Sequence, residues 1–291
     1  HMLYNVTTMA TTWHTVATKN IGLLRLQMDI VNSLPKEYLF LNYLRCHDDI
    51  GWGLDYRWLM QFGIGEVSHK KYLNDYFTGQ FPGSTARGEL YNSDPASGDA
   101  RLCGTTASLC GVEKGAFEQN KEALSLAMAL DFMLHAYMFT QSGIPVIYSG
   151  DEIGQENDYT YHEDPARRDD SRYIHRGKFN WELAEKRKDA GSVQEVLFTG
   201  LRKLEKIRKE HPVFYSKADV WTIDTWEDSV LGLVRVYEDE KLVALFNFSE
   251  QEKTAWINEE DGTYTDLISG KEMEAKGVTM PGYGVYWLLR E

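Results

Sequence analysis

Residues 38–49, with the sequence Tyr-Leu-Phe-Leu-Asn-Tyr-Leu-Arg-Cys-His-Asp-Asp, decide the fold class. Their first part is an almost continuous apolar run, which predicts a strand over 38–46 that is buried on both faces, as in a parallel sheet. A second short apolar run, 144–148, follows a predicted helix over 118–141 and leads into Gly150-Asp151-Glu152. Strands that alternate with helices predict parallel pairing with crossover connections. The polar residues that follow each strand then lie where active sites of such sheets are found.

The rest of the chain divides by its patterning. Apolar residues at helical spacing predict one helix or two abutting helices over 3–31 and an amphipathic helix over 193–210. Residues 54–115 are rich in glycine and aromatics, and we interpret them as an inserted subdomain with short helices. The last 80 or so residues hold several short strand-like runs separated by turns, which predict an antiparallel sandwich. We therefore predict an α/β region over 1–211 and an all-β domain over 212–291.

Composition narrows the classes of partner. The 291 residues carry a formal net charge of −13, which disfavours nucleic acid and anionic lipid surfaces and fits a neutral or polar substrate. Three cysteines are too few for a disulfide framework, so we expect a reducing, cytoplasmic location. No apolar run approaches the roughly 18 residues that a membrane helix needs, so no membrane partner is expected.

Two polar clusters are candidate sites. Residues 45–49 place a histidine beside two aspartates, which suits a metal site, a general acid/base pair, a grip on sugar hydroxyls or a solvated turn. Neighbouring strand residues point to opposite faces, which disfavours a metal, and no metal is predicted. The second cluster is Gly150-Asp151-Glu152 together with residues 164–172. Its alternating acids and arginines can fix a loop through bidentate ion pairs or form a weak surface network. Aromatic residues near these loops can stack on sugar rings or fill the core.

Five stretches carry a family resemblance. Residues 45–52 and 143–152 resemble the last two barrel-strand motifs of the α-amylase family of glycoside hydrolases. Residues 81–88, 98–105 and 169–176 resemble its amylosucrase and sucrose hydrolase branch. The resemblance implies that residues 1–211 are the C-terminal units of a (β/α)8 TIM barrel. The subdomain at about 54–115 would be inserted into it, and a C-terminal β-sandwich domain would follow over 212–291. It also makes the strand at 38–46 the seventh of the barrel.

The resemblance assigns roles to five residues. Asp48 matches the aspartate that stabilises the transition state, and His47 matches the histidine that holds hydroxyls of the glucosyl ring. Asp49 and Arg172 match a pair whose salt bridge closes the bottom of a pocket for one glucosyl unit. Arg101 matches an arginine that lines the acceptor side. No cofactor is implied.

Retaining enzymes of this kind also need a carboxylate nucleophile and a carboxylic acid. The sequence contexts that carry them in the family do not occur between residues 1 and 291. We therefore expect a C-terminal fragment of an amylosucrase-like enzyme, one that transfers glucose from sucrose to α-glucan or water, with no activity on its own and a natural N-terminus upstream of Leu3. An α-glucosidase, sucrose hydrolase or trehalose-forming isomerase fragment is the alternative within enzymes.

A different class of function stays open. The predicted sandwich carries Trp221, Trp226 and Trp256, and a non-catalytic module could bind glucan through them. The strands of a partial barrel would also expose unpaired edges, which predicts oligomers formed through those edges.

Overall fold

A computed structural model describes residues 2–259 and 262–290 of the chain. The chain forms two compact units. Unit 1 contains His1–Tyr43, Phe132–Val146 and Gly200–Glu291, and unit 2 contains Leu44–Asp131 and Ile147–Thr199. These units group segments by contact, and the predicted domain limits at 211/212 and about 54–115 stay predictions.

Unit 1 contains a small parallel sheet. Its strands are β1 (Met2–Tyr4), β2 (Leu39–Asn42) and β6 (Ile144–Pro145), in the order β1-β2-β6. The helices α1 (Val6–Thr18) and α2 (Gly22–Asn32) connect β1 to β2. The predicted pair of abutting helices is thus confirmed except at its start. The first residues form a strand because their backbone pairs with β2. The pairing continues one residue beyond β1, where the Asn5 N–H donates to the Leu41 carbonyl at 3.0 Å.

The parallel strands are shorter and less buried than predicted. The chain leaves the sheet after Asn42, whose amide donates to the Ser142 carbonyl at 3.0 Å, so the strand predicted over 38–46 covers only four residues. Leu39, Phe40 and Leu41 are half-buried, and the prediction of burial on both faces is wrong for them. The physical reason is the extent of the sheet, since three short strands give β2 few neighbours to cover it.

Two long helices match their predictions. The helix α7 (Lys121–Thr140) lies within the range predicted for it, and α9 (Val193–Glu210) has the predicted limits. By length and composition α7 is also able to cross a membrane, contrary to the estimate from apolar runs, and 61% of that stretch is buried within the structure. A mostly buried core helix meets the same criteria of length and composition.

Unit 2 consists of short elements around a three-stranded antiparallel sheet. The sheet has the order β3-β5-β4, formed by β3 (Ile50–Gly51), β5 (Arg101–Cys103) and β4 (Glu89–Tyr91). The short helices expected in the insertion are present: α3 (Tyr56–Met60), α4 (Glu66–Phe77), α5 (Thr106–Cys110) and α6 (Val112–Phe117). A further short helix, α8 (Trp181–Glu185), follows several 3-10 turns. Trp52 stacks on Phe77 of α4 with ring centroids 5.7 Å apart, so the loop after β3 is packed against the insertion.

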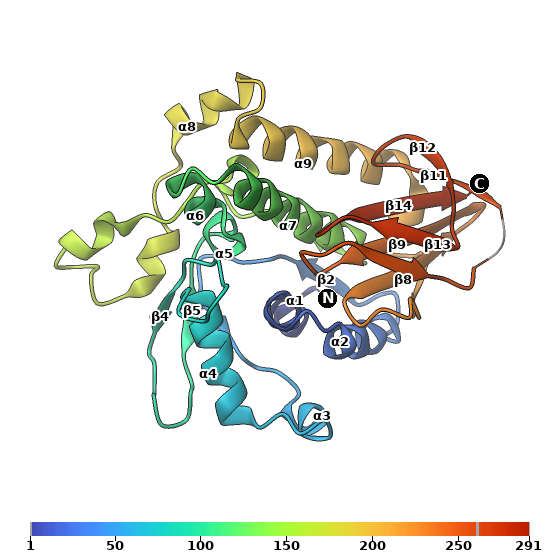
Figure 1. Cartoon of the computed structure of the whole chain (residues 1–291). Helices are drawn as coiled ribbons and strands as arrows, with labels where there is room; N and C mark the ends of the chain where they lie inside the picture. Colours follow the sequence, from blue (N-terminus) through green and yellow to red (C-terminus); the bar gives the residue numbers. More distant parts are fainter. Residues whose placement is uncertain (1, 260–261, 291) are drawn as a thin grey trace. The chain divides into compact units, whose positions relative to one another are not determined.

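The C-terminal part of unit 1 is an antiparallel sandwich, drawn in orange and red in Figure 1. A six-stranded sheet of order β12-β11-β14-β9-β8-β7 and a two-stranded sheet of β10 and β13 share one apolar core. The strands are β7 (Asp219–Ile223), β8 (Val230–Tyr237), β9 (Glu240–Asn247), β10 (Lys253–Trp256), β11 (Thr263–Asp266), β12 (Lys271–Glu274), β13 (Gly277–Met280) and β14 (Val285–Arg290). The predicted sandwich is confirmed, with β12 and β13 as additional strands.

A buried arginine joins the sandwich to the end of α7 within unit 1. Arg235 of β8 is fully buried and donates to the carbonyls of Val213, Tyr215 and Thr140 at 2.8, 2.8 and 2.6 Å. Because buried carbonyls need donors, this guanidinium fixes three chain segments around one point.

Candidate functional site

A buried ion pair anchors the candidate site, which lies in unit 2. Arg45 donates from Nε to Asp151 Oδ1 at 2.8 Å, and its Nη2 lies 2.7 Å from the same oxygen. Both side chains are 2% exposed. Thr106 donates to the other carboxylate oxygen at 3.0 Å, and the Tyr148 ring lies under the guanidinium at 4.5 Å. The pair therefore fixes the start of the loop that carries residues 46–49.

His175 extends this anchor. The Gly104 N–H donates to His175 Nδ1 at 3.0 Å, which leaves the ring proton on Nε2, facing the His47 carbonyl at 3.4 Å. Arg45 donates to the His175 carbonyl at 3.3 Å. Burial, with the Arg45 cation nearby, lowers the pKa of His175 to about 3. His175 is thus a neutral positioning group over the physiological range.

Asp48 and His47 lie side by side on the surface of the loop. His47 Nε2 is 3.5 Å from Asp48 Oδ2, and the two side chains are 67% and 55% exposed. Arg176 reaches both residues, since its Nε donates to the His47 carbonyl at 2.5 Å and its Nη2 lies 3.5 Å from Asp48 Oδ1. The arrangement exposes a carboxylate and an imidazole to a ligand, and the contacts of Arg176 with both residues hold them in place.

Arg172 does not pair as the resemblance implied. It holds Asp170 in a bidentate pair, with Nε and Nη2 each 2.8 Å from a carboxylate oxygen. These hydrogen bonds hold the pKa of the Asp170 carboxyl below its usual value. Asp170 also lies 4.0 Å from Arg176. The physical reason for the different pairing is local, because Asp170 caps the 3-10 turn at Ser171–His175 by accepting the Arg172 N–H at 3.1 Å.

Asp49 pairs instead with Arg101, whose Nε lies 3.7 Å from Asp49 Oδ2. Gly51 and Arg101 are cross-strand partners on β3 and β5, and a Cβ at Gly51 would collide with the Arg101 guanidinium. Arg101 also lines an open hollow of about 410 Å³ together with Trp52, Asn92 and the ion-paired Lys70 and Asp99. Such a volume suits a small ligand.

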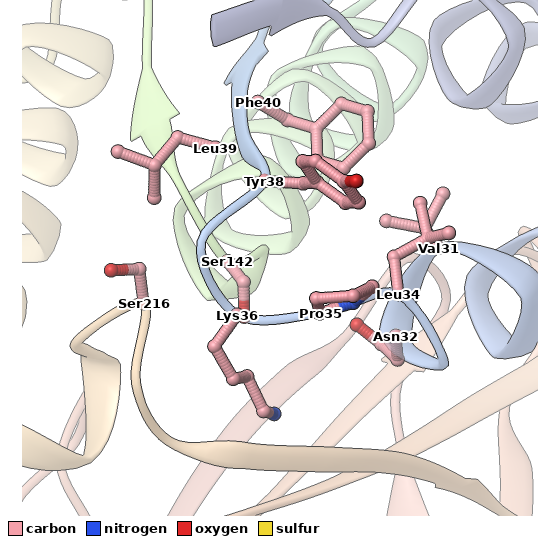
Figure 2. A pocket seen from close by; sticks show the side chains of 10 residues that line it. All are labelled: Val31, Asn32, Leu34, Pro35, Lys36, Tyr38, Leu39, Phe40, Ser142 and Ser216. Carbon is pink, nitrogen blue, oxygen red and sulfur yellow. The ribbon is translucent and has the colours of Figure 1, made fainter. Parts of the chain in front are cut away.

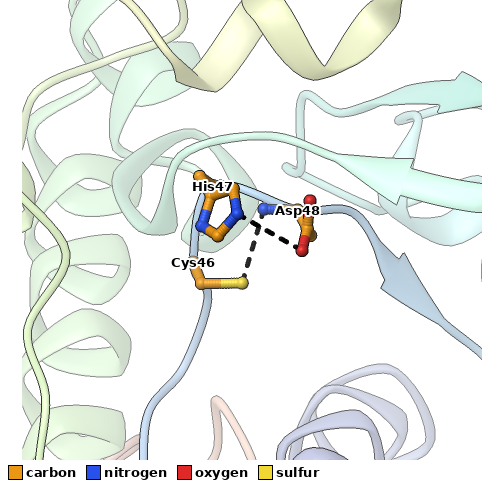
Figure 3. Close-up of side chains that lie close together, drawn as sticks. All are labelled: Cys46, His47 and Asp48. Carbon is orange, nitrogen blue, oxygen red and sulfur yellow. Dashed lines mark hydrogen bonds and ion pairs between the residues drawn. The ribbon is translucent and has the colours of Figure 1, made fainter.

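Cys46, His47 and Asp48 form a compact group of possible metal donors (Figure 3). One atom of each lies within 4.8 Å of the others. The group is possible because the residues follow the strand rather than belong to it, so they do not alternate between two faces. Burial raises the pKa of the Cys46 thiol, which disfavours the thiolate that binds metals. The absence of a metal stays a prediction.

A second cavity, shown in Figure 2, lies in unit 1 between the turn after α2 and Ser216. Its volume of about 20 Å³ holds roughly one water and is too small for a sugar. The hollow beside Arg101 is therefore the better candidate for a ligand.

All five residues predicted for the site lie in unit 2. Ion pairs join Arg172, Asp170, Arg176 and Asp48 in one chain, and Asp49 and Arg101 in another. Sequence reasoning missed Asp170, Arg176 and His175 as members. All three lie in the stretch 169–176, so the signal that could have found them was the density of charged residues there.

Three comparisons relate the chain to known proteins. Residues 222–279 match the profile of the bacterial α-amylase C-terminal domain. A curated relative, glucosylglycerate phosphorylase of Escherichia coli (strain K12), is 28% identical over 158 residues, which are 54% of this chain and 27% of that protein.

Two solved structures share the fold. Sucrose 6F-phosphate phosphorylase from Thermoanaerobacter thermosaccharolyticum matches with a TM-score of 0.61 and 16% identity, over 94% of this chain and 47% of that one. AmyP in complex with maltose matches with a TM-score of 0.58 and 16% identity, over 99% and 49%. The chain thus spans about half the length of these structures and about a quarter of the curated relative. It has the fold predicted for it, C-terminal units of a (β/α)8 barrel followed by an antiparallel β-sandwich, and its residues 222–279 are similar to the C-terminal domain of bacterial α-amylases.

Proposed function

We propose that this chain supplies substrate-holding residues to a retaining α-glucoside-acting enzyme of the amylosucrase type. The reaction is glucosyl transfer from sucrose to an α-glucan or to water. Asp48 stabilises the transition state, His47 binds hydroxyls of the glucosyl ring, and Arg101 lines the acceptor side. Asp49 and Arg172 shape the same region through their pairs with Arg101 and Asp170.

The observation that carries the proposal is the joint placement of Asp48 and His47 above a rigid base. Arg176 contacts both residues, and the buried pair of Arg45 and Asp151 fixes the loop beneath them. A preorganised carboxylate favours the positive charge that develops on the sugar ring in an oxocarbenium-like transition state. The charge on Asp48 is needed for this role, since a neutral group of the same shape gives no such stabilisation.

The proposal places the nucleophile and the acid on residues outside these 291, because retaining chemistry requires both carboxyl groups. Two observations support this division: the chain covers about half the length of the solved structures that it matches, and residues 222–279 match an α-amylase C-terminal domain. The chain alone is then inactive, and the site works when further barrel units complete it.

Product analysis on the polypeptide that includes the preceding barrel units tests this function. With sucrose as donor, we expect fructose release together with glucose or a growing α-glucan. Asp48→Asn should lower the rate by about 100-fold or more, in the range measured for groups that stabilise transition-state charge. Unchanged turnover in Asp48→Asn would remove Asp48 from the proposed role.

Phosphorolysis is the second candidate. Two of the similar proteins are phosphorylases by name, which favours phosphate as the alternative acceptor for the glucosyl group. The same assay in phosphate buffer separates the two reactions, because phosphorolysis yields glucose 1-phosphate where transfer yields free glucose or polymer.

A further inference from the structure

The outer face of the two-stranded sheet in the sandwich carries an exposed indole. Ala255, Val278 and Met280 point into the shared core, so Trp256, Thr254 and their partners on β13 form the opposite face. Trp256 is 57% exposed, and its six-membered ring packs against Gly277, where an added Cβ would meet it at 2.9 Å. The missing side chain at Gly277 lets the indole lie close to the sheet and keep its outer face open.

A second indole starts from the adjacent backbone. The Trp256 N–H donates to the Thr225 carbonyl at 3.0 Å, which places Trp226 next to it. Trp226 is 77% exposed and has a φ of 57°, a left-handed conformation that bulky residues rarely adopt. Asp224 stabilises this conformation by accepting the Trp226 N–H at 3.0 Å. Unfavourable backbone that exposes a large aromatic side chain is typical of binding sites.

Hydroxyls and paired charges surround the two indoles. The hydroxyls of Thr254 and Thr279 lie 3.1 Å apart on the same face as Trp256. The charged side chains that flank the surface are in ion pairs, Lys253 with Glu227 at 3.3 Å and Arg25 with Asp224 at 3.9 Å. The surface therefore offers aromatic faces and hydroxyls, and two of the acids beside it are held by basic side chains, which fits a neutral polar ligand.

We propose that Trp226 and Trp256 form a binding surface for an α-glucan chain, called here the indole surface. A pyranose ring fits both the aromatic faces and the hydroxyls of this surface. Its C–H face stacks on an indole, and its hydroxyls form hydrogen bonds with Thr254 and Thr279. A neutral glucan also suits a protein with a net charge of −13, which would repel an acidic polymer. The surface lies in unit 1, does not involve Asp48, and would hold glucan whether or not the proposed catalytic function is correct.

Isothermal titration of the intact chain with maltoheptaose tests the proposal. We expect saturable binding, weakened about tenfold by Trp226→Ala and by Trp256→Ala, which corresponds to the loss of one stacking contact. Trp256→Phe should retain part of the affinity because it keeps an aromatic face. Circular dichroism of each variant confirms that the fold is intact.

Trp181→Ala is the matched control, since Trp181 is 74% exposed but lies on α8 in unit 2. It should bind maltoheptaose as the parent chain does. The proposal is overturned if the parent chain does not bind at millimolar maltoheptaose, or if Trp226→Ala and Trp256→Ala bind normally. Loss of binding in Asp48→Ala alone would move the glucan to the proposed catalytic site, and a dimer that dissociates in Trp226→Ala would assign the indole surface to a second copy of the chain.

Discussion

Arg45 and Asp151 form an ion pair of 2.7 Å in which both side chains are 98% buried, although they stand 106 residues apart in the chain. Each charge can be buried only because the other neutralises it, since an unpaired charge in the interior is strongly unfavourable. The pair joins the polar residues that follow the two predicted strands, residues 45–49 after the first and residues 150–152 after the second.

Removing one partner should therefore destabilise the fold. We expect Asp151→Asn to lower the free energy of unfolding by about 3 kcal/mol or more, measured by urea denaturation, because Arg45 keeps its charge without a counter-ion. The double variant Arg45→Met, Asp151→Asn should be less destabilised than the sum of the two single variants. Arg167→Ala breaks a more exposed pair with Asp164 and should change stability by about 0.5 kcal/mol or less. A similar small effect in Asp151→Asn would show that the buried pair is unimportant.

Burial of His175 makes stability depend on pH. Its folded pKa of about 3 lies below the ordinary value of 6.5, so the unfolded chain takes up a proton first as the pH falls. As the pH falls from about 6.5 to about 3, protonation of this residue in the unfolded chain should lower the free energy of unfolding by about 1.4 kcal/mol per pH unit. Above about pH 6.5 His175 causes no such loss.

Comparison of the parent chain with His175→Asn isolates this contribution. We expect the difference in unfolding free energy between pH 7 and pH 4.5 to be smaller in the variant, whose Oδ1 can still accept the Gly104 N–H. Equal pH profiles for the parent and His175→Asn would argue against a neutral, buried His175.

A double-mutant cycle can determine which arginine pairs with Asp49. We expect a coupling of about 0.5 kcal/mol between Asp49→Asn and Arg101→Gln, the usual size for a partly exposed pair. Asp49→Asn and Arg172→Gln should be additive, since Arg172 is held by Asp170. A larger coupling with Arg172 than with Arg101 would restore the pairing that the resemblance implied.

The parallel sheet predicts self-association. Its order places β1 and β6 at the edges of the described sheet, and Met2, Leu3 and Tyr4 of β1 are exposed. Open edges of this kind pair with other chains. Light scattering should show a mass above that of a monomer that rises with concentration and returns toward the monomer in Leu3→Lys. Val67→Lys makes the same change at an exposed position on α4 and should have no effect. A monomer at all concentrations would contradict this expectation.

The fold was predictable where its signal is periodic. Helix α9 and most strands of the sandwich follow from apolar spacing, because each of these elements repeats its apolar residues at the period of its own secondary structure. Strand β1 was not predicted because three residues are too few to show the alternation of apolar and polar side chains that marks a strand. Only its pairing with β2 makes it a strand. The predicted strands extend beyond the observed ends of β2 and β6, because the apolar residues that follow these strands belong to loops.

The site was predictable in its members but not in its pairs. The stretches that contain Asp48, Asp49 and Arg172 are recognisable from the sequence alone. Which acid each arginine holds depends on local turns, and the capping geometry of Asp170 decides the partner of Arg172. Spacing in the sequence does not contain that information.

The activity of the purified 291-residue chain tests the central claim most directly. The chain is incubated with sucrose, and glucose and fructose are measured after long reaction times at high enzyme concentration. We predict no release, because the proposed function assigns the nucleophile and the acid to residues outside these 291. Release of glucose or fructose by the chain alone, lost in Asp48→Asn, would show that the 291 residues hold a complete catalytic site and would contradict the account.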